Sequence, residues 1–124
     1  MGDLTKNFNT AEFRCKCGSC GDSENKMDMD FLKSLQDARD VAARPFNITS
    51  GFRCATHPES VKRPTSSHTI GVAVDIATPD SISRYVVVRA LIRAGLSRIG
   101  IGNSFVHVDK DPGKPPNVMW DYYG

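Results

Sequence analysis

The stretch SSHTIGVAVDIA, residues 66–77, decides the fold, because its apolar second half carries one carboxylate. Residues 72–77 predict a β-strand, whose side chains alternate between two faces. The two valines and Ile76 then face the core, whereas Asp75 shares the other face with alanines. A carboxylate among apolar groups is costly unless it is paired or binds a metal ion. The stretch therefore predicts a partner for Asp75.

A second predicted strand, Phe105-Val106-His107-Val108-Asp109, repeats this pattern, with two valines on one face and His107 and Asp109 on the other. His68 lies where a long polar loop leads into the first strand. Two imidazoles and a carboxylate form a three-ligand set with an open fourth position, which is typical of catalytic zinc. The combination predicts a zinc site at His68, Asp75 and His107. The competing interpretation places His68 on the surface and His107 in the core.

The rest of the chain predicts an α+β fold. Apolar residues recur at helical spacing from Asp28 or Asp30 up to Pro45, and again from Ser81 or Ser83 to Ala94. Further strands are expected at residues 46–50, 98–102 and 118–123. This mixture predicts a small, mainly antiparallel sheet flanked by two main helices. The length of 124 residues predicts a single domain over 1–124.

The composition is that of an ordinary globular protein, with 40% hydrophobic and 24% charged residues and a formal net charge of +2. So weak a positive charge does not indicate a nucleic-acid partner. No apolar run approaches the ~20 residues of a membrane helix, and the N-terminus lacks the apolar core of a signal peptide. We therefore expect no nucleic-acid partner and no membrane partner. We also expect the protein to be a monomer.

Three of the four cysteines, Cys15, Cys17 and Cys20, lie in a Cys-rich N-terminal loop, residues 15–25, and the fourth is Cys54. Four thiolates in a reducing compartment would suit a second, structural zinc. A disulfide between the loop and Cys54 would suit an extracellular protein, and four free thiols are the third alternative. The sequence leaves all three open.

The motif Ser67-x-His68-x-x-Gly71-x-Ala73-x-Asp75, followed by a His in a strand, resembles the zinc D-Ala-D-Ala carboxypeptidase and L-Ala-D-Glu endopeptidase family. These enzymes cut the peptides of bacterial peptidoglycan, many phage endolysins belong to them, and they share the fold of the hedgehog signalling domain. Residues 48–54, Ile-Thr-Ser-Gly-Phe-Arg-Cys, are similar to the family's Thr-Ser-Gly-Tyr-Arg stretch, and residues 104–109 look like its closing strand. The resemblance spans roughly residues 8 to 122.

This resemblance implies a hedgehog/DD-peptidase-like fold and zinc ligands at His68, Asp75 and His107. It implies that Arg53 binds substrate and stabilises developing negative charge, and that Ser67 lies in the substrate site. The expected reaction is hydrolysis of amide bonds in peptidoglycan stem peptides, with zinc-activated water attacking a carbonyl polarised by zinc and Arg53.

The sequence departs from the family at Ser104, where many members carry a carboxylate three residues before the last His ligand as general base. Asp109 is the nearest substitute on that strand face. It could accept a proton from the water, which we expect, or it could only orient a ligand. His57 or Glu59 in the long loop could also transfer the proton.

Two alternative functions stay open at this stage. The missing carboxylate would suit a catalytically inactive, zinc-containing cell-wall binding module. A D-Ala-D-Ala dipeptidase or carboxypeptidase would use the same metal site. The lack of a signal peptide favours a protein made in the cytoplasm that reaches the cell wall after holin release, as an endolysin does, or as part of a phage particle.

Overall fold

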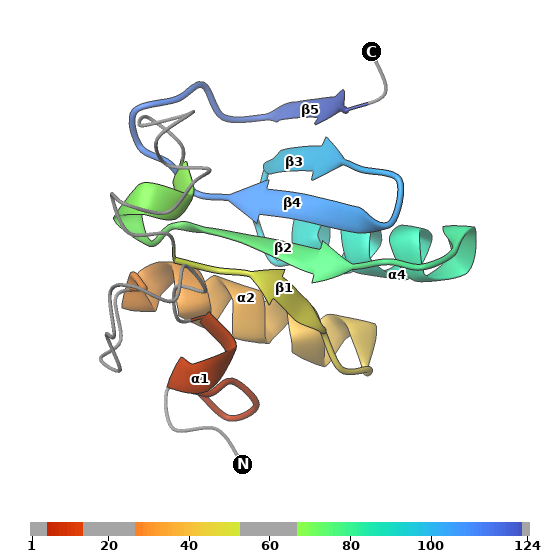
Figure 1. Ribbon diagram of the computed structural model, residues 1–124, viewed down its shortest axis with the longest axis horizontal. Coiled ribbons are helices and arrows are strands. Elements are labelled where there is room, and N and C mark those ends of the chain that lie inside the picture. Colours follow the sequence, from red (N-terminus) through yellow and green to blue (C-terminus); the bar gives the residue numbers. More distant parts are fainter. Residues whose placement is uncertain (1–4, 14–26, 53–66, 123–124) are drawn as a thin grey trace.

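The computed structural model describes residues 5–13, 27–52 and 67–122 (Figure 1). In chain order its elements are α1 Thr10–Phe13, α2 Met29–Ala42, β1 Ile48–Ser50, the 3₁₀ helix η1 Ser67–Ile70, β2 Ala73–Ala77, α4 Ser81–Arg93, β3 Arg98–Ile101, β4 Phe105–Asp109 and β5 Val118–Asp121. The predicted α+β fold with two main helices and a mainly antiparallel sheet is confirmed.

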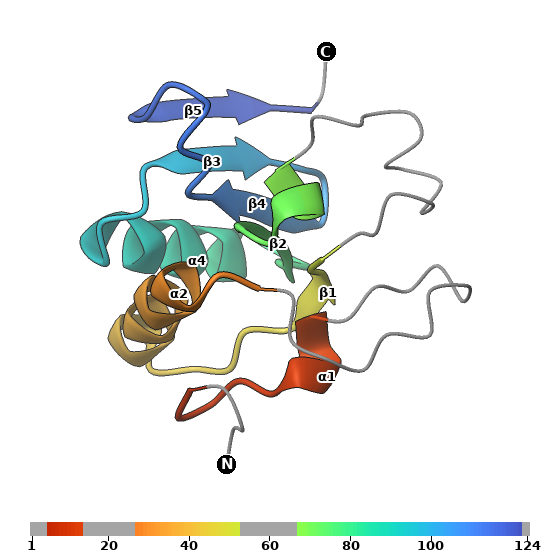
Figure 2. The same ribbon diagram turned by 90° about the vertical axis from the view of Figure 1, so that its left-hand side faces the viewer.

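In the described part of the chain, five strands form one sheet in the order β1-β2-β4-β3-β5. The first four pair antiparallel, whereas the edge strand β5 runs parallel to β3. Helices α2 and α4 cover one face of the sheet, and η1 lies on the opposite side (Figure 2). One face is therefore closed by helices, and the other carries the side chains considered below.

Each main helix begins at an aspartate. Asp28 accepts a hydrogen bond from the backbone N–H of Phe31 and starts α2. Asp80 starts α4 through a capping box with Ser83, in which each side chain bonds the other's backbone. The sequence had indicated Ser81 or Ser83 as this cap. Asp80 takes the position because its carboxylate is free to accept the N–H of Ser83.

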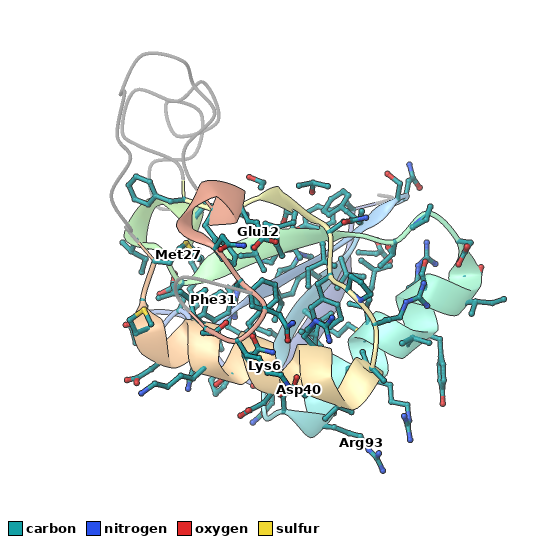
Figure 3. The ribbon with its side chains drawn as sticks, turned by 90° about the horizontal axis from the view of Figure 1, so that it is seen from below. Lys6, Glu12, Met27, Phe31, Asp40 and Arg93 are labelled. Carbon is teal, nitrogen blue, oxygen red and sulfur yellow. The ribbon has the colours of Figure 1, made fainter. Side chains whose placement is uncertain are left out.

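The core fills the layer between the helices and the sheet (Figure 3). Phe31 of α2 is among the labelled side chains there, whereas Arg93 of α4 extends away from the molecule. The inward-facing strand residues are fully buried, as the alternation predicted: Val74, Ile76, Val106 and Val108. Burial of this apolar set is the main stabilising contribution to the fold.

The end of α1 packs against the two residues that follow β1. The backbone N–H of Phe52 donates to the carbonyl of Phe13 at 2.8 Å, and a Cβ on Gly51 would come within 2.7 Å of the Cα and O of Phe13. Only glycine permits this approach, which sets the position of Gly51 next to the site. Among the described residues, no helix is long and apolar enough to cross a bilayer.

Candidate metal centre

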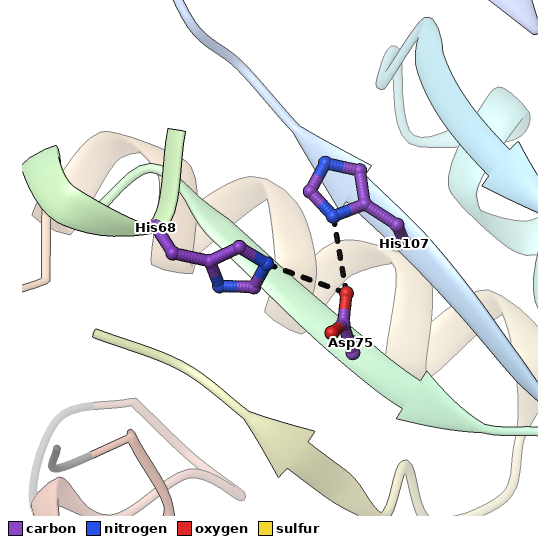
Figure 4. Close-up of side chains that lie close together, drawn as sticks. All are labelled: His68, Asp75 and His107. Atoms are coloured by element: carbon purple, nitrogen blue, oxygen red, sulfur yellow. Dashed lines mark hydrogen bonds and ion pairs between the residues drawn. The ribbon is translucent and has the colours of Figure 1, made fainter. Parts of the chain in front are cut away.

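Three side chains from three elements converge on the open face of the sheet (Figure 4). Asp75 of β2 and His107 of β4 are directly opposite each other in the antiparallel register, and His68 reaches them from η1. Asp75 Oδ1 lies 3.0 Å from Nδ1 of His107 and 3.4 Å from Nε2 of His68. One ligand atom from each residue lies within 4.8 Å of the others, so the strand register and the short η1 turn build the group.

In each imidazole, the ring nitrogen that does not face Asp75 makes a hydrogen bond to the protein. Nδ1 of His68 lies 2.8 Å from the carbonyl oxygen of Gly51. A carbonyl oxygen only accepts, so this nitrogen carries a proton, and Nε2 is the ring nitrogen that faces Asp75. Nε2 of His107 lies 2.7 Å from Oδ2 of Asp109, which in the same way leaves Nδ1 to face Asp75. Hydrogen bonds of this kind set the tautomer of metal-binding histidines.

Asp109 lies behind His107, on the side of the ring away from Asp75. Its two oxygens are engaged: Oδ2 by His107, and Oδ1 by Arg98 Nε at 2.7 Å and the backbone N–H of Asp111 at 3.2 Å. The carboxylate is almost fully buried. Of the two roles considered for Asp109, this position favours orientation of a ligand, because the imidazole ring stands between the carboxylate and the group's centre.

Electrostatics keep the two carboxylates ionised. Burial by itself would raise the pKa of Asp75, but hydrogen bonds with His107 and His68 outweigh it and hold that pKa well below its ordinary value. Burial would lower the pKa of His107, yet hydrogen bonds to Asp109 and Asp75 raise it. His107 thus shares its two ring positions with two anions, and a metal cation can take the place of the Nδ1 proton.

Ser67 ties η1 to the residues that follow β4. Its buried hydroxyl donates to Oδ2 of Asp111 at 2.8 Å and accepts from Nζ of Lys114 at 3.1 Å. Asp111 also accepts the N–H of Gly113. The network fastens η1, and with it His68, to the segment after β4. These contacts make Ser67 an anchor of η1, and its predicted contact with substrate stays a prediction.

Several predicted residues fall outside the described part of the chain: Arg53, His57, Glu59, Cys15, Cys17, Cys20 and Cys54. Their predicted roles stay predictions, including the second zinc at the cysteines. Ser104 is described and exposed, immediately before β4.

Sequence reasoning missed Arg98 and Asp111, which complete the surroundings of Asp109. Arg98 lies opposite Asp109 in the antiparallel register of the β3–β4 hairpin. The short turn at residues 102–104 fixes that register, so the pairing of Arg98 with Asp109 could have been predicted from the sequence. Asp111 lies in irregular chain, where no periodicity indicates direction.

The donor set fits a zinc ion. Two imidazole nitrogens and one carboxylate oxygen are ligand types of catalytic zinc. The second nitrogen of each imidazole is hydrogen-bonded, and both His68 and His107 are buried.

The family model described as Peptidase M15 matches residues 6–109, which is most of the chain and includes every residue of the candidate metal centre. The comparison with curated proteins finds no similar sequence.

Proposed function

The chain belongs to the M15 family of zinc peptidases, and we propose that it hydrolyses amide bonds in the stem peptides of bacterial peptidoglycan, as an endolysin-like enzyme of cell-wall lysis. One observation carries the proposal. The donor atoms of His68, Asp75 and His107 converge on one point, with both imidazoles turned toward it by hydrogen bonds. The motif resemblance to the peptidoglycan enzymes supports the choice of substrate.

When zinc is held by His68, Asp75 and His107, it supplies a Lewis acid that polarises a carbonyl and lets water act as a nucleophile near neutral pH. The chain's own groups prepare this. The carbonyl of Gly51 accepts a hydrogen bond from Nδ1 of His68, and the carboxylate of Asp109 accepts one from Nε2 of His107, so the other nitrogen of each ring is the one that would bind the ion. Arg98 holds Asp109 in place through Nε.

Substrate binding and proton transfer fall to the segment that joins β1 to η1. We propose that Arg53 binds the substrate and the developing oxyanion, because a guanidinium donates two parallel hydrogen bonds to such oxygens. Since Asp109 faces away from the metal centre, we assign proton transfer to His57 or Glu59. Replacing each in turn, with measurement of kcat against pH, identifies which of them acts.

The direct test is mass spectrometry of purified peptidoglycan after digestion. We expect new amino and carboxyl termini within the stem peptide, lost on chelation, restored by zinc, and lost in His68→Ala. Lys33→Ala, on the exposed face of α2, is the matched control and should digest like the wild type. Undiminished digestion by the zinc-free His68→Ala protein would refute the proposal. The termini also name the bond, which separates an endopeptidase from a D,D-carboxypeptidase.

A second candidate function is a zinc-containing module that binds the cell wall without cutting it. The observation in its favour is the lack of an evident general base among the described residues. Both oxygens of Asp109 are bonded to His107 and Arg98, and Ser104 stands where many family members carry a carboxylate. Such a protein would sediment with purified cell walls and release no new termini at any zinc concentration.

A further inference from the structure

An aromatic band extends from the metal centre across the open face of the sheet. It consists of Trp120 of β5, Tyr122 just after it, and Phe105 of β4. The ring centroids of His107 and Trp120 are 5.7 Å apart, those of Trp120 and Tyr122 are 6.5 Å apart, and those of Tyr122 and Phe105 are 5.4 Å apart. The band therefore begins in contact with a metal ligand.

The band depends on a glycine in the middle of the sheet. Gly100 of β3 pairs with His107 on one side and with Trp120 on the other. A Cβ on Gly100 would lie 2.7 Å from Nε1 of Trp120 and 2.8 Å from the hydroxyl oxygen of Tyr122. Any side chain at position 100 would fill the space that Trp120 and Tyr122 occupy. Because residue 100 is glycine, Trp120 of β5 can approach His107 of β4 across the intervening strand β3.

The band is also held in place and accessible. The guanidinium of Arg98 lies 5.1 Å from the Trp120 ring centroid and is itself fixed by Asp109 and by the carbonyl of Pro115. Such a cation–π contact restrains the indole. Trp120 and Phe105 are half-buried, and Tyr122 is 45% exposed. A rigid apolar surface next to a metal centre is suited to ligand binding.

We propose that Trp120, with Tyr122 and Phe105, forms a subsite that stacks on a pyranose ring of the glycan strand to which the scissile peptide is attached. This rests on the proposed peptidoglycan substrate. Stem peptides carry mainly methyl, carboxylate and amine side chains, which offer little to a wide aromatic surface. The sugar rings present flat C–H faces, the kind of apolar surface that an indole covers well.

The subsite makes the enzyme prefer peptides that are still joined to sugar. Two of its three residues, Trp120 of β5 and Tyr122 just after it, lie beyond residues 6–109, the part of the chain that the M15 model matches. Trp120 is therefore assigned as a specificity-determining residue that lies outside the matched range.

Binding can be measured without turnover, because Trp120 is the only tryptophan of the chain. The zinc-loaded protein is titrated with a peptide-free oligomer of N-acetylglucosamine and N-acetylmuramic acid while its tryptophan emission is recorded. We expect a saturable change in emission. An emission spectrum that does not respond to this oligomer overturns the proposal, whether or not the protein is a peptidase.

Turnover supplies the second test. We compare kcat/KM for a disaccharide-linked stem peptide with kcat/KM for the same peptide without sugar. In Trp120→Ala the ratio of the two values should fall about tenfold, the loss expected for about 1.4 kcal/mol of contact. Trp120→Phe should restore much of the ratio, and Tyr85→Ala, an exposed aromatic on α4, should keep the wild-type ratio.

Zinc content, measured by native mass spectrometry, shows whether each variant retains its metal centre. A ratio that stays at the wild-type value in zinc-loaded Trp120→Ala refutes the sugar subsite and reduces Trp120 to a packing partner of His107. If the wild type cuts neither substrate, the proposed function fails, and the emission titration still decides the sugar subsite.

Discussion

Replacing Asp109 by asparagine separates the two roles that its position on β4 allows. Asn has nearly the same shape but offers one oxygen and one NH₂ group. Nε of Arg98 and the N–H of Asp111 both donate to Oδ1, so the asparagine oxygen must face them. Its NH₂ group then faces Nε2 of His107, which has to accept.

In the neutral ring the proton of His107 is then confined to Nδ1, the atom that faces Asp75 at 3.0 Å. A protonated Nδ1 cannot bind a metal ion. The variant must give up either this tautomer or a buried hydrogen bond before zinc binds. We expect zinc affinity to fall about 10- to 100-fold, or about 1.4 to 2.8 kcal/mol. At saturating zinc much of kcat should return.

Zinc affinity is measured by competition with a chromophoric chelator, and kcat is measured over a zinc titration. Asp37→Asn, the same chemical change at an exposed position of α2, should bind zinc like the wild type. If Asp109→Asn keeps wild-type zinc affinity while kcat collapses at saturating zinc, the reasoning is refuted, and Asp109 transfers the proton.

Three further changes test the surroundings of the site. Ser67→Ala should lower the free energy of unfolding by about 1 kcal/mol, because it removes the hydrogen bond to Asp111; urea denaturation checks this, and a raised KM at unchanged stability would show substrate contact instead. Gly51→Ala places a Cβ within 2.7 Å of the Phe13 backbone and should cost about 1–3 kcal/mol by the same measurement, with weaker zinc binding. Ala43→Gly should stabilise the protein by about 0.5–1 kcal/mol, seen as a higher Tm, because Ala43 ends α2 at a left-handed φ of 55°; a lower Tm would contradict this.

Strand alternation was sufficient to predict the faces of the site. Val74 and Ile76 are fully buried toward the helices, and Asp75 emerges on the other side. The same rule applied to β4 put His107 on the open face. These predictions needed only residues within one strand, because the period of two is a property of the extended backbone itself.

The role of Asp109 required information from a neighbouring strand. Alternation places its side chain on the same face as His107 but does not say which way the carboxylate turns. Arg98, opposite Asp109 on β3, draws one oxygen away and leaves the other against Nε2 of His107. A residue's chemical role here depends on cross-strand partners, which a strand's own sequence does not contain.

The position of β5 was still less accessible to sequence reasoning. An edge strand was expected at residues 118–123, but its parallel pairing with β3 depends on the path of residues 110–117 around the sheet. Parallel pairing needs a long connection, and no local turn specifies its register. The approach of Trp120 to His107 follows only from that register together with Gly100.

The charges along the open face explain why a cation suits the centre. From β3 toward η1, a positive guanidinium, Arg98, is followed by the carboxylate of Asp109, the imidazole of His107 and the carboxylate of Asp75. Two carboxylates, of Asp109 and Asp75, flank the imidazole of His107, and Nε2 of His68 faces the Asp75 carboxylate. A divalent ion among these donors continues the alternation of sign, satisfies the buried Asp75 carboxylate, and requires only that His107 give up the Nδ1 proton. An ion bound at this centre would thereby offset the cost of burying Asp75 in an apolar strand.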